Sequence, residues 1–192
     1  GLLITHEHSD HVRGAGIFSR MFNIPIYANN RTWESMHKSI GKIKDENIKI
    51  INTDESFFIG DIEVKAYSIP HDAIDPVGYC FFNNGKKVSI ATDIGHLSEN
   101  VLNNIKGSDL VLLESNHDVE MLKVGPYPYI LKRRILGDRG HLSNDDAGKA
   151  ILRLVGEKFI TVVLGHLSQQ NNYPELAYRT VLSILEENGV YT

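Results

Sequence analysis

Thr5-His6-Glu7-His8-Ser9-Asp10-His11 places four metal-ligating side chains within six residues near the start of the chain. Three are imidazoles and one is a carboxylate, the donor set that zinc and its first-row neighbours prefer. Alternate side chains of an extended segment share a face, so His6 and His8 can hold one ion. Asp10 and His11 follow where the chain turns toward a helix, and they can reach a second ion. Solvated surface histidines are the weaker interpretation, because His and Asp at ligand spacing are typical of metal sites.

Composition predicts one globular domain over residues 1–192, with 42% hydrophobic and 23% charged residues. The net charge of −4 does not indicate general nucleic-acid binding, so a local basic patch would have to provide it. We find no stretch long enough to span a bilayer and no signal peptide, so we expect no membrane partner and a reducing cytoplasm. The single cysteine, Cys80, is predicted to be a buried packing residue. The oligomeric state is not predicted.

The start of the chain is unusual for a metal site. Leu2-Leu3-Ile4 is typical of the end of a buried strand, and the ligand cluster follows at once. No earlier strand is present to support that cluster. We therefore expect the N-terminal strands of the domain to be missing from this sequence or to be supplied otherwise.

The hydrophobic pattern predicts strands in the first half of the chain and alternating strands and helices in the second. Strands are expected at 2–4, 24–28, 48–51, 56–59, 62–69, 77–82, 87–91, 109–113 and 159–164. Helical segments are expected at 12–22, 31–42 with Asn30 as cap, 97–105, 119–123, 127–136, 144–155 with Ser143 or Asn144 as cap, and 174–187. This order favours a layered α/β sandwich.

Three further ligand-type residues follow predicted strands. His71, Asp93 and His166 each lie where a strand gives way to a loop. Strand ends gather at one edge of a sheet, where sites are often built. Taken singly, each is more often an ordinary loop residue. Their occurrence together with the opening cluster favours ligation.

The ligand order resembles that of the metallo-β-lactamase fold superfamily over nearly the whole chain. The resemblance implies an αββα four-layer sandwich with a two-metal site along one sheet edge. It implies a first metal held by His6, His8 and His71. It implies a second metal held by Asp10, His11 and His166. Asp93 would bridge the two ions.

The donor set suits hydrolysis by two divalent ions. Two metals can hold a hydroxide between them and polarise a phosphoryl or carbonyl oxygen. Zn²⁺ is the first expectation, and Mn²⁺ or Fe would also accept these ligands. Asp10 can orient the attacking water as a catalytic residue, as well as ligate. Glu7 is expected to face away from the metals and to support the loop.

Three further motifs narrow the resemblance. They are Glu114-Ser115-Asn116-His117-Asp118, Gly140-His141-Leu142-Ser143-Asn144 and Gly165-His166-Leu167-Ser168-Gln169-Gln170-Asn171-Asn172. With the opening cluster they resemble the bacterial WalJ/YycJ-like subgroup, related to ribonuclease Z and the β-CASP nucleases. The resemblance implies a DNA exonuclease-type phosphodiesterase. The span from Asp93 to His166 is too short for a large β-CASP insertion, so we expect a compact, open site.

Several residues are candidates for substrate contact. Ser143 and Asn144 begin a helix, and exposed helix N-termini bind phosphate. His141 can donate a proton to the leaving oxygen or bind the scissile phosphate, and a loop-fixing role is equally open. Asn116 and His117 can bind substrate, although we prefer a role in positioning metal ligands.

Lys132, Arg133, Arg134 and Arg139 form a concentrated basic stretch. These side chains are candidates for contacts with backbone phosphates, of DNA more than of RNA, and a solvated helix face is the alternative. The leading hypothesis is thus a metal-dependent phosphodiesterase. A glyoxalase II, lactonase or thioesterase-type acyl hydrolase would use the same metal ligands. A purely binding or regulatory protein is disfavoured because the ligand set is complete.

Overall fold

The computed structural model describes residues 1–156 and 160–191. The chain divides into two compact units. Unit 1 comprises Gly1–Ser68 and Asp72–Asn83, and unit 2 comprises Ile69–His71 and Asn84–Thr192. Each described helix and strand lies wholly within one of these units.

Unit 1 contains a small parallel sheet in the order β1-β2-β3. Its strands are β1 (Leu2–Leu3), β2 (Ile26–Asn29) and β3 (Ile48–Ile51). The connecting helices are α1 (Ser9–Val12), α2 (Ala15–Phe22), α3 (Asn30–Ile40) and the 3₁₀ turn η1 (Asp45–Asn47). Ile26 and Ala28 are fully buried beneath Met36 of α3 in one apolar cluster. This cluster holds the strand that precedes the opening ligands.

The cap of α3 is Asn29, which corrects the predicted Asn30. Asn29 has an extended backbone, and its side-chain oxygen accepts a hydrogen bond from the Thr32 amide at 2.9 Å. Asn30 is the first helical residue, and its amide donates to Glu34. The helix therefore starts one residue earlier than predicted, because β2 ends at Asn29.

The predicted helix 12–22 corresponds to α2, which begins at Ala15 because a separate short helix, α1, ends at Val12, and the large apolar residues of α2 face outward. Ala15, Gly16 and Ser19 are the buried residues of α2. Ile17, Phe18, Met21 and Phe22 are 50 to 68% exposed. A Cβ on Gly16 would collide with the Ile40 carbonyl, so the small residues allow the close approach to α3.

Unit 1 also contains three antiparallel strands, which confirm the predicted 56–69 hairpin. They are β4 (Ser56–Ile59), β5 (Ile62–Ser68) and β6 (Val77–Asn83). Gly60 has the positive φ of +63° that the tight turn between β4 and β5 requires. Cys80 is fully buried in β6, as predicted. Ala66 and Tyr79 are among the residues that form the apolar core of these strands.

Unit 2 contains three parallel strands in the order β7-β8-β9. They are β7 (Lys86–Ala91), β8 (Leu110–Glu114) and β9 (Thr161–Gly165), and their register aligns Ala91 with Leu113 and Leu113 with Leu164. The carboxyl ends of the strands therefore meet at one edge. Asp93 and His166 lie immediately beyond that edge. The predicted strand 159–164 begins at Thr161, and Phe159 lies outside the described residues.

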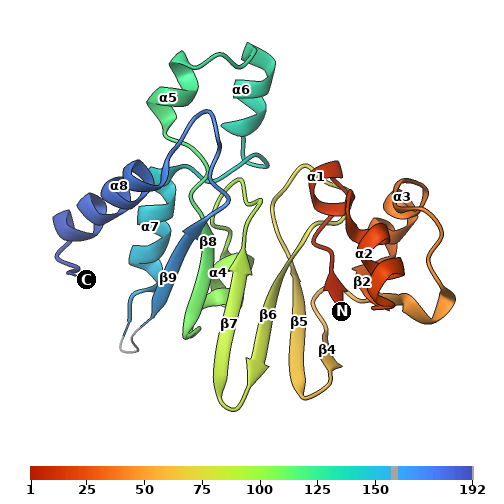
Figure 1. The fold of residues 1–192 in the computed structure, drawn as a ribbon. Coiled ribbons are helices and arrows are strands. Elements are labelled where there is room, and N and C mark those ends of the chain that lie inside the picture. The colour runs from red at the N-terminus through yellow and green to blue at the C-terminus, as the bar shows by residue number, and fades with distance from the viewer. Residues whose placement is uncertain (157–159, 192) are drawn as a thin grey trace. The chain divides into compact units, whose positions relative to one another are not determined.

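Five helices complete the described part of unit 2 (Figure 1). They are α4 (Glu99–Ile105), α5 (Val119–Val124), α6 (Tyr129–Ile135), α7 (Asn144–Leu154) and α8 (Pro174–Glu187). α7 packs closely against α8, because Gly148 leaves room for Ile184. α5 and α6 form a pair in the connection between β8 and α7. Within the residues described, no helix has the length and apolar character needed to cross a membrane.

Candidate metal centre and its supporting residues

The opening cluster gathers three imidazoles, His6 and His8 from the loop after β1 and His11 from α1. His6 is fully buried, and its Nε2 lies 3.0 Å from Nδ1 of His8. The ring of His11 lies 4.1 Å from that of His6, centroid to centroid. The Thr5 hydroxyl lies 3.0 Å from Nδ1 of His6 and 3.3 Å from Nδ1 of His11. The predicted shared face of His6 and His8 is therefore present, and a hydroxyl orients two of the rings.

The loop that carries these imidazoles is held by the segment before β6. The Val77 amide donates to the Thr5 carbonyl at 3.0 Å. The Ile74 amide donates to Oε1 of Glu7 at 3.0 Å. Glu7 therefore supports the loop, in agreement with the prediction from the sequence.

Asp10 lies in the first turn of α1 and is the most exposed of the predicted metal ligands. Its side chain is 75% exposed, against 22% for His11, and its carboxylate lies 3.7 Å from Nε2 of His11. A carboxylate in this position is free to contact either an ion or solvent water. Its predicted roles as a ligand and as a catalytic residue remain predictions.

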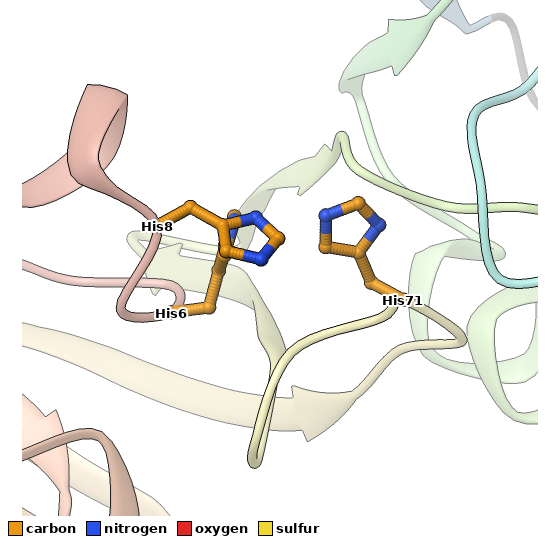
Figure 2. Close-up of side chains that lie close together, drawn as sticks. All are labelled: His6, His8 and His71. Atoms are coloured by element: carbon orange, nitrogen blue, oxygen red, sulfur yellow. The ribbon is translucent and has the colours of Figure 1, made fainter. Parts of the chain in front are cut away.

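His71 is anchored by backbone hydrogen bonds within unit 2. Figure 2 shows this ring together with His6 and His8; His71 comes from the loop that follows β5, and the other two come from the loop between β1 and α1. Its Nδ1 lies 3.1 Å from the Gly140 carbonyl, so Nδ1 carries the proton and Nε2 keeps a lone pair. The Arg139 guanidinium donates twice to the His71 carbonyl, at 3.0 and 2.7 Å. Arg139 thus fixes this loop, and its predicted contact with substrate remains a prediction.

Asp93 lies at a spacing from two histidines that suits shared metal ions. Its Oδ1 is 3.6 Å from Nε2 of His71 and 3.6 Å from Nε2 of His166. These distances are too long for hydrogen bonds. Two ligand atoms on one tetrahedral zinc ion are separated by about 3.4 Å, given bond lengths of about 2.1 Å. The spacing therefore fits a carboxylate that shares an ion with each imidazole.

Both candidate ligands that follow the parallel strands have an uncommon backbone. Asp93 has φ of +57° and His166 has φ of +56°. Residues other than glycine rarely adopt this left-handed conformation, and it is concentrated at functional sites. The backbone turns sharply after β7 and β9, which brings both side chains back over the strand ends.

Glu114, the last residue of β8, is the centre of the site in unit 2. Its Oε1 accepts hydrogen bonds from Nδ1 of His141 at 2.9 Å and from Nδ1 of His166 at 2.6 Å. Its Oε2 accepts from the amides of Ile94 and Leu142 at 2.8 and 3.1 Å. The side chain is fully buried, so four donors replace water around one carboxylate.

These donors keep Glu114 ionised. Burial acts to raise its pKa, but the hydrogen bonds and charges of His141 and His166 outweigh burial and lower the pKa to about 2. An ionised acceptor requires a proton on Nδ1 of each ring, and Nε2 is the ring nitrogen directed away from Glu114. The ligand-type atoms of Asp93, Glu114, His141 and His166 all lie within 4.8 Å of one another. This donor set fits a divalent cation.

The prediction from the sequence did not identify Glu114 as a site residue. A signal was present, because Glu114 directly follows four apolar residues, Leu110–Leu113, that predict a buried strand. A carboxylate at the end of such a strand is buried and needs several donors. The neighbouring strand ends supply Asp93 and His166, so the same argument that found those ligands applies to Glu114.

Asn116 and Asn144 hold the loops of the site. The Asn116 amide group donates to the His166 carbonyl at 2.8 Å. Asn144 is fully buried, where its side chain bonds Ser115 at 2.6 Å and Asn172 at 2.8 Å. These contacts position the ligand loops, the role preferred for Asn116 from the sequence. Substrate contact by either residue remains a prediction.

Ser143 caps α7, and His117 lies beside it. The Ser143 hydroxyl accepts from the Asp146 amide at 3.1 Å, which settles the cap between the two predicted candidates. His117 is 1% exposed, and in the described residues neither ring nitrogen has a hydrogen-bond partner. Burial lowers the pKa of His117, and the Glu114 charge opposes that effect. His117 is therefore a buried, neutral imidazole beside Ser143.

Comparison with known families identifies the class of this protein. Residues 1–166 match the family model described as the β-lactamase superfamily domain. The chain belongs to this superfamily. The ligand types at the strand ends of unit 2 agree with the metal-dependent branch of that class, since divalent ions need such donors.

The most informative relatives are bacterial. The chain is 43% identical over 189 residues to a Bacillus anthracis protein named exodeoxyribonuclease YycJ, covering 98% of this chain and 72% of the relative. It is 39% identical over 188 residues to exodeoxyribonuclease WalJ of Streptococcus pneumoniae, covering 97% of this chain and 70% of the relative. The predicted subgroup resemblance is therefore confirmed.

A solved structure confirms the fold class. The metallo-β-lactamase fold protein YhfI from Bacillus subtilis matches with a TM-score of 0.70 at 15% identity, covering 95% of this chain and 70% of that chain. At this identity the likeness concerns the fold alone. The predicted metallo-β-lactamase-type α/β architecture is correct.

Proposed function

We propose that this protein is a metal-dependent phosphodiesterase that removes nucleotides from the ends of DNA. The observation that carries the proposal is the buried Glu114 carboxylate, which orients both His141 and His166. Similarity to two proteins named exodeoxyribonucleases supports DNA as the substrate. The family match spans 1–166, which supports one catalytic domain over the chain.

The proposed ligand set is the one that the family resemblance implies. The first ion would be held by His6, His8 and His71. The second ion would be held by Asp10, His11 and His166. Asp93 is the shared ligand, which its 3.6 Å distances to His71 and His166 support. When bound, the two ions polarise the scissile phosphate and lower the pKa of water, with Zn²⁺ as the first choice and Mn²⁺ or Fe as substitutes.

His141 is the proposed proton donor. Its Nδ1 is held by the ionised Glu114, and its side chain is 20% exposed while that of Glu114 is fully buried. Because Nδ1 is directed at Glu114, Nε2 of His141 faces away from that carboxylate and, when it carries a proton, presents that proton outward. That proton can pass to the oxygen of the leaving nucleotide. The same carboxylate fixes the tautomer of His166, so that its Nε2 lone pair serves as a ligand.

Substrate phosphates beyond the scissile bond need their own contacts. The N-terminus of α7, with Ser143 and Asn144, and the basic residues before His141 remain the candidates. An acyl hydrolase with the same ligands would need none of these contacts. The relatives named exodeoxyribonucleases favour the phosphodiester.

The test is a cleavage assay with metal-loaded protein. DNA labelled at the 5′ end, single-stranded and double-stranded, is incubated with the wild type and with Asp93→Ala. We expect stepwise shortening by the wild type and at least a 100-fold loss in the variant. Thermal unfolding of both proteins verifies that Asp93→Ala is folded. The pattern of labelled products gives the polarity of digestion.

The opposite result is equally clear. A wild-type protein with two bound ions that leaves every DNA substrate intact would overturn the proposal. Activity on a thioester or lactone panel under the same conditions would then assign an acyl hydrolase.

A further inference from the structure

The helix pair α5–α6 forms a connection that starts and ends at the site in unit 2. The chain leaves at Glu114, forms α5 and α6, and returns at His141, whose ring hydrogen-bonds Glu114 at 2.9 Å. The Gly140 carbonyl at the returning end lies 3.1 Å from Nδ1 of His71. Figure 1 shows the two short helices side by side, joined at the end away from the strands. The two ends of this connection, at Glu114 and His141, therefore lie at the proposed catalytic residues, and a strand bound along the helices would lead away from them.

The outer part of this connection, residues 121–137, is basic in an otherwise acidic chain. Residues 121–137 contain four Lys or Arg residues and no Asp or Glu. The whole chain has 20 Lys and Arg against 24 Asp and Glu. Lys123 and Arg133 are exposed, and the Lys123 ammonium donates to the Glu120 carboxylate at 2.7 Å, a surface ion pair that a phosphate would have to displace. A local positive charge of this kind attracts polyanions even where the net charge of the protein is negative.

The same connection exposes large apolar and aromatic side chains. Val124, Tyr129 and Ile130 are 85%, 73% and 83% exposed. The Arg133 guanidinium lies 5.9 Å from the centre of the Tyr129 ring, within range of a cation–π contact. An exposed aromatic ring beside an exposed cation is the combination on which unpaired bases stack.

These exposed residues are not needed to hold the helix pair together. Leu122 and Ile135 are the buried apolar residues of α5 and α6. The Lys132 ammonium donates to the Lys123 carbonyl at 2.7 Å and ties α6 to α5. The pair is therefore stabilised from within, without a buried role for Val124, Tyr129 or Ile130.

We infer that the α5–α6 surface, defined as Lys123, Val124, Tyr129, Ile130 and Arg133, binds single-stranded DNA that continues from the scissile nucleotide. Lys123 and Arg133 contact its phosphates, and one base stacks on Tyr129. A single strand is favoured over a duplex, because bases inside a duplex are already stacked on each other. This inference rests on the proposed function.

The first test measures binding rather than cleavage. The zinc-loaded protein is titrated into an end-labelled oligothymidylate, and fluorescence anisotropy measures the bound fraction. The oligonucleotide carries phosphorothioate linkages, which resist hydrolysis. We expect Tyr129→Ala to weaken binding about tenfold, the effect of losing one base–aromatic stack. Tyr129→Phe keeps the ring and should bind within about twofold of the wild type. A blunt duplex should bind Tyr129→Ala and the wild type equally.

The salt dependence separates charge from stacking. Each phosphate contact to a single strand contributes about 0.7 to the slope of log affinity against log salt concentration. Arg133→Ala should therefore reduce the slope by about 0.7. Tyr129→Ala should lower the affinity and leave the slope unchanged.

Tyr178 and Arg179 on α8 provide matched controls. They are also an exposed tyrosine and an exposed arginine in a helix. Tyr178→Ala and Arg179→Ala should leave oligonucleotide affinity, salt slope and cleavage unchanged. Equal losses from Tyr129→Ala and Tyr178→Ala would overturn the inference.

A lipid surface is the competing ligand for an apolar and basic patch. Loss of binding to phosphatidylglycerol vesicles in Tyr129→Ala and Arg133→Ala, with oligonucleotide binding intact, would overturn the inference. The binding assay needs no turnover. A protein that fails to cleave DNA yet binds the single strand through Tyr129 would contradict the proposed function alone.

Discussion

The opening cluster of unit 1 and the Glu114 cluster of unit 2 hold their candidate ligands in different ways. His6, His8 and His11 come from one short segment, the loop after β1 and the helix α1 that follows it, and a neutral hydroxyl, that of Thr5, lies beside two of their rings. In unit 2, His141 and His166 come from separate loops, and one ionised carboxylate orients both. Local chain geometry brings together the first group, whereas a buried charge organises the second.

This difference has a consequence for mutations. When a hydroxyl is removed, its former hydrogen-bond partners can bond to water or to another group, so the loss of stability is modest. A buried carboxylate that is lost leaves four donors without an acceptor, and two of these belong to site residues. We therefore expect the Glu114 cluster to be the more fragile of the two.

The largest effect is expected for Glu114→Gln. Glutamine has nearly the same shape, but it carries one acceptor oxygen and an amide group that points hydrogens at buried donors. We expect a loss of about 3 kcal/mol in the free energy of unfolding, as for a broken buried ion pair. Cleavage of labelled DNA should fall at least 100-fold, because His141 and His166 lose their orientation. Urea unfolding and kcat/KM measure the two effects.

Glu7→Gln is the matched control in unit 1. Glu7 also accepts a backbone hydrogen bond through Oε1, from Ile74, but it binds no imidazole in the described contacts. We expect its loss to cost about 1 kcal/mol of stability. If Glu7→Gln and Glu114→Gln cost the same, the proposed contrast between the clusters is wrong.

An intermediate effect is expected for Thr5→Val. Valine keeps the shape of threonine and removes the hydroxyl that lies 3.0 Å from Nδ1 of His6 and 3.3 Å from Nδ1 of His11. The affinity for metal should fall about tenfold, the lower end of the range for outer hydrogen bonds to ligating histidines. Stability of the metal-free protein should change by less than about 1 kcal/mol. Competition with a zinc-binding dye measures the affinity.

Thr5→Ser provides the rescue, since it restores the hydroxyl. An affinity loss in Thr5→Ser as large as in Thr5→Val would mean that methyl packing, and not the hydroxyl, positions the rings. A loss in Thr5→Val as large as in Glu114→Gln would remove the contrast between the clusters.

The same contrast explains what the sequence could predict about the site. The opening ligands are adjacent in sequence, so their spacing alone predicts a shared face. Glu114 was missed because its histidine partners are 27 and 52 residues away. No local pattern contains that information. The strand-end argument found Asp93 and His166 because their residue types suggest ligation, whereas a glutamate that ends a strand has many ordinary explanations.

The fold shows a similar limit. Strand and helix positions were predicted within a few residues, since periodicity is local. The outward face of α2 was not predicted, because its direction depends on the close approach of Gly16 to the Ile40 carbonyl. The cap of α3 differs by one residue, because Asn29 and Asn30 are equally good caps and the end of β2 decides between them.

The smallest effect is expected for Asp146→Asn at the start of α7. The Asp146 carboxylate accepts from the Ser143 hydroxyl at 2.8 Å and from Lys149 at 3.0 Å. Burial acts to raise its pKa, but these two partners lower the pKa below 3.8. A carboxyl whose pKa is lowered by folding stabilises the folded state at pH values above its ordinary pKa. That contribution is lost as the pH falls through the pKa of the folded state. The variant should lose roughly 0.5 kcal/mol at neutral pH.

The pH dependence distinguishes charge from capping geometry. Urea unfolding at neutral pH and well below pH 3.8 should give a difference between wild type and Asp146→Asn that shrinks at the lower pH. Asp145→Asn removes the neighbouring first-turn charge and leaves the bond to Ser143 in place. If both variants show the same change with pH, the helix dipole explains the effect. If the stability difference for Asp146→Asn stays constant with pH, the effect comes from the hydrogen-bond geometry at Ser143 and not from the charge of Asp146. The start of α7 would then be held by neutral hydrogen bonds, as the rings beside the Thr5 hydroxyl are in unit 1.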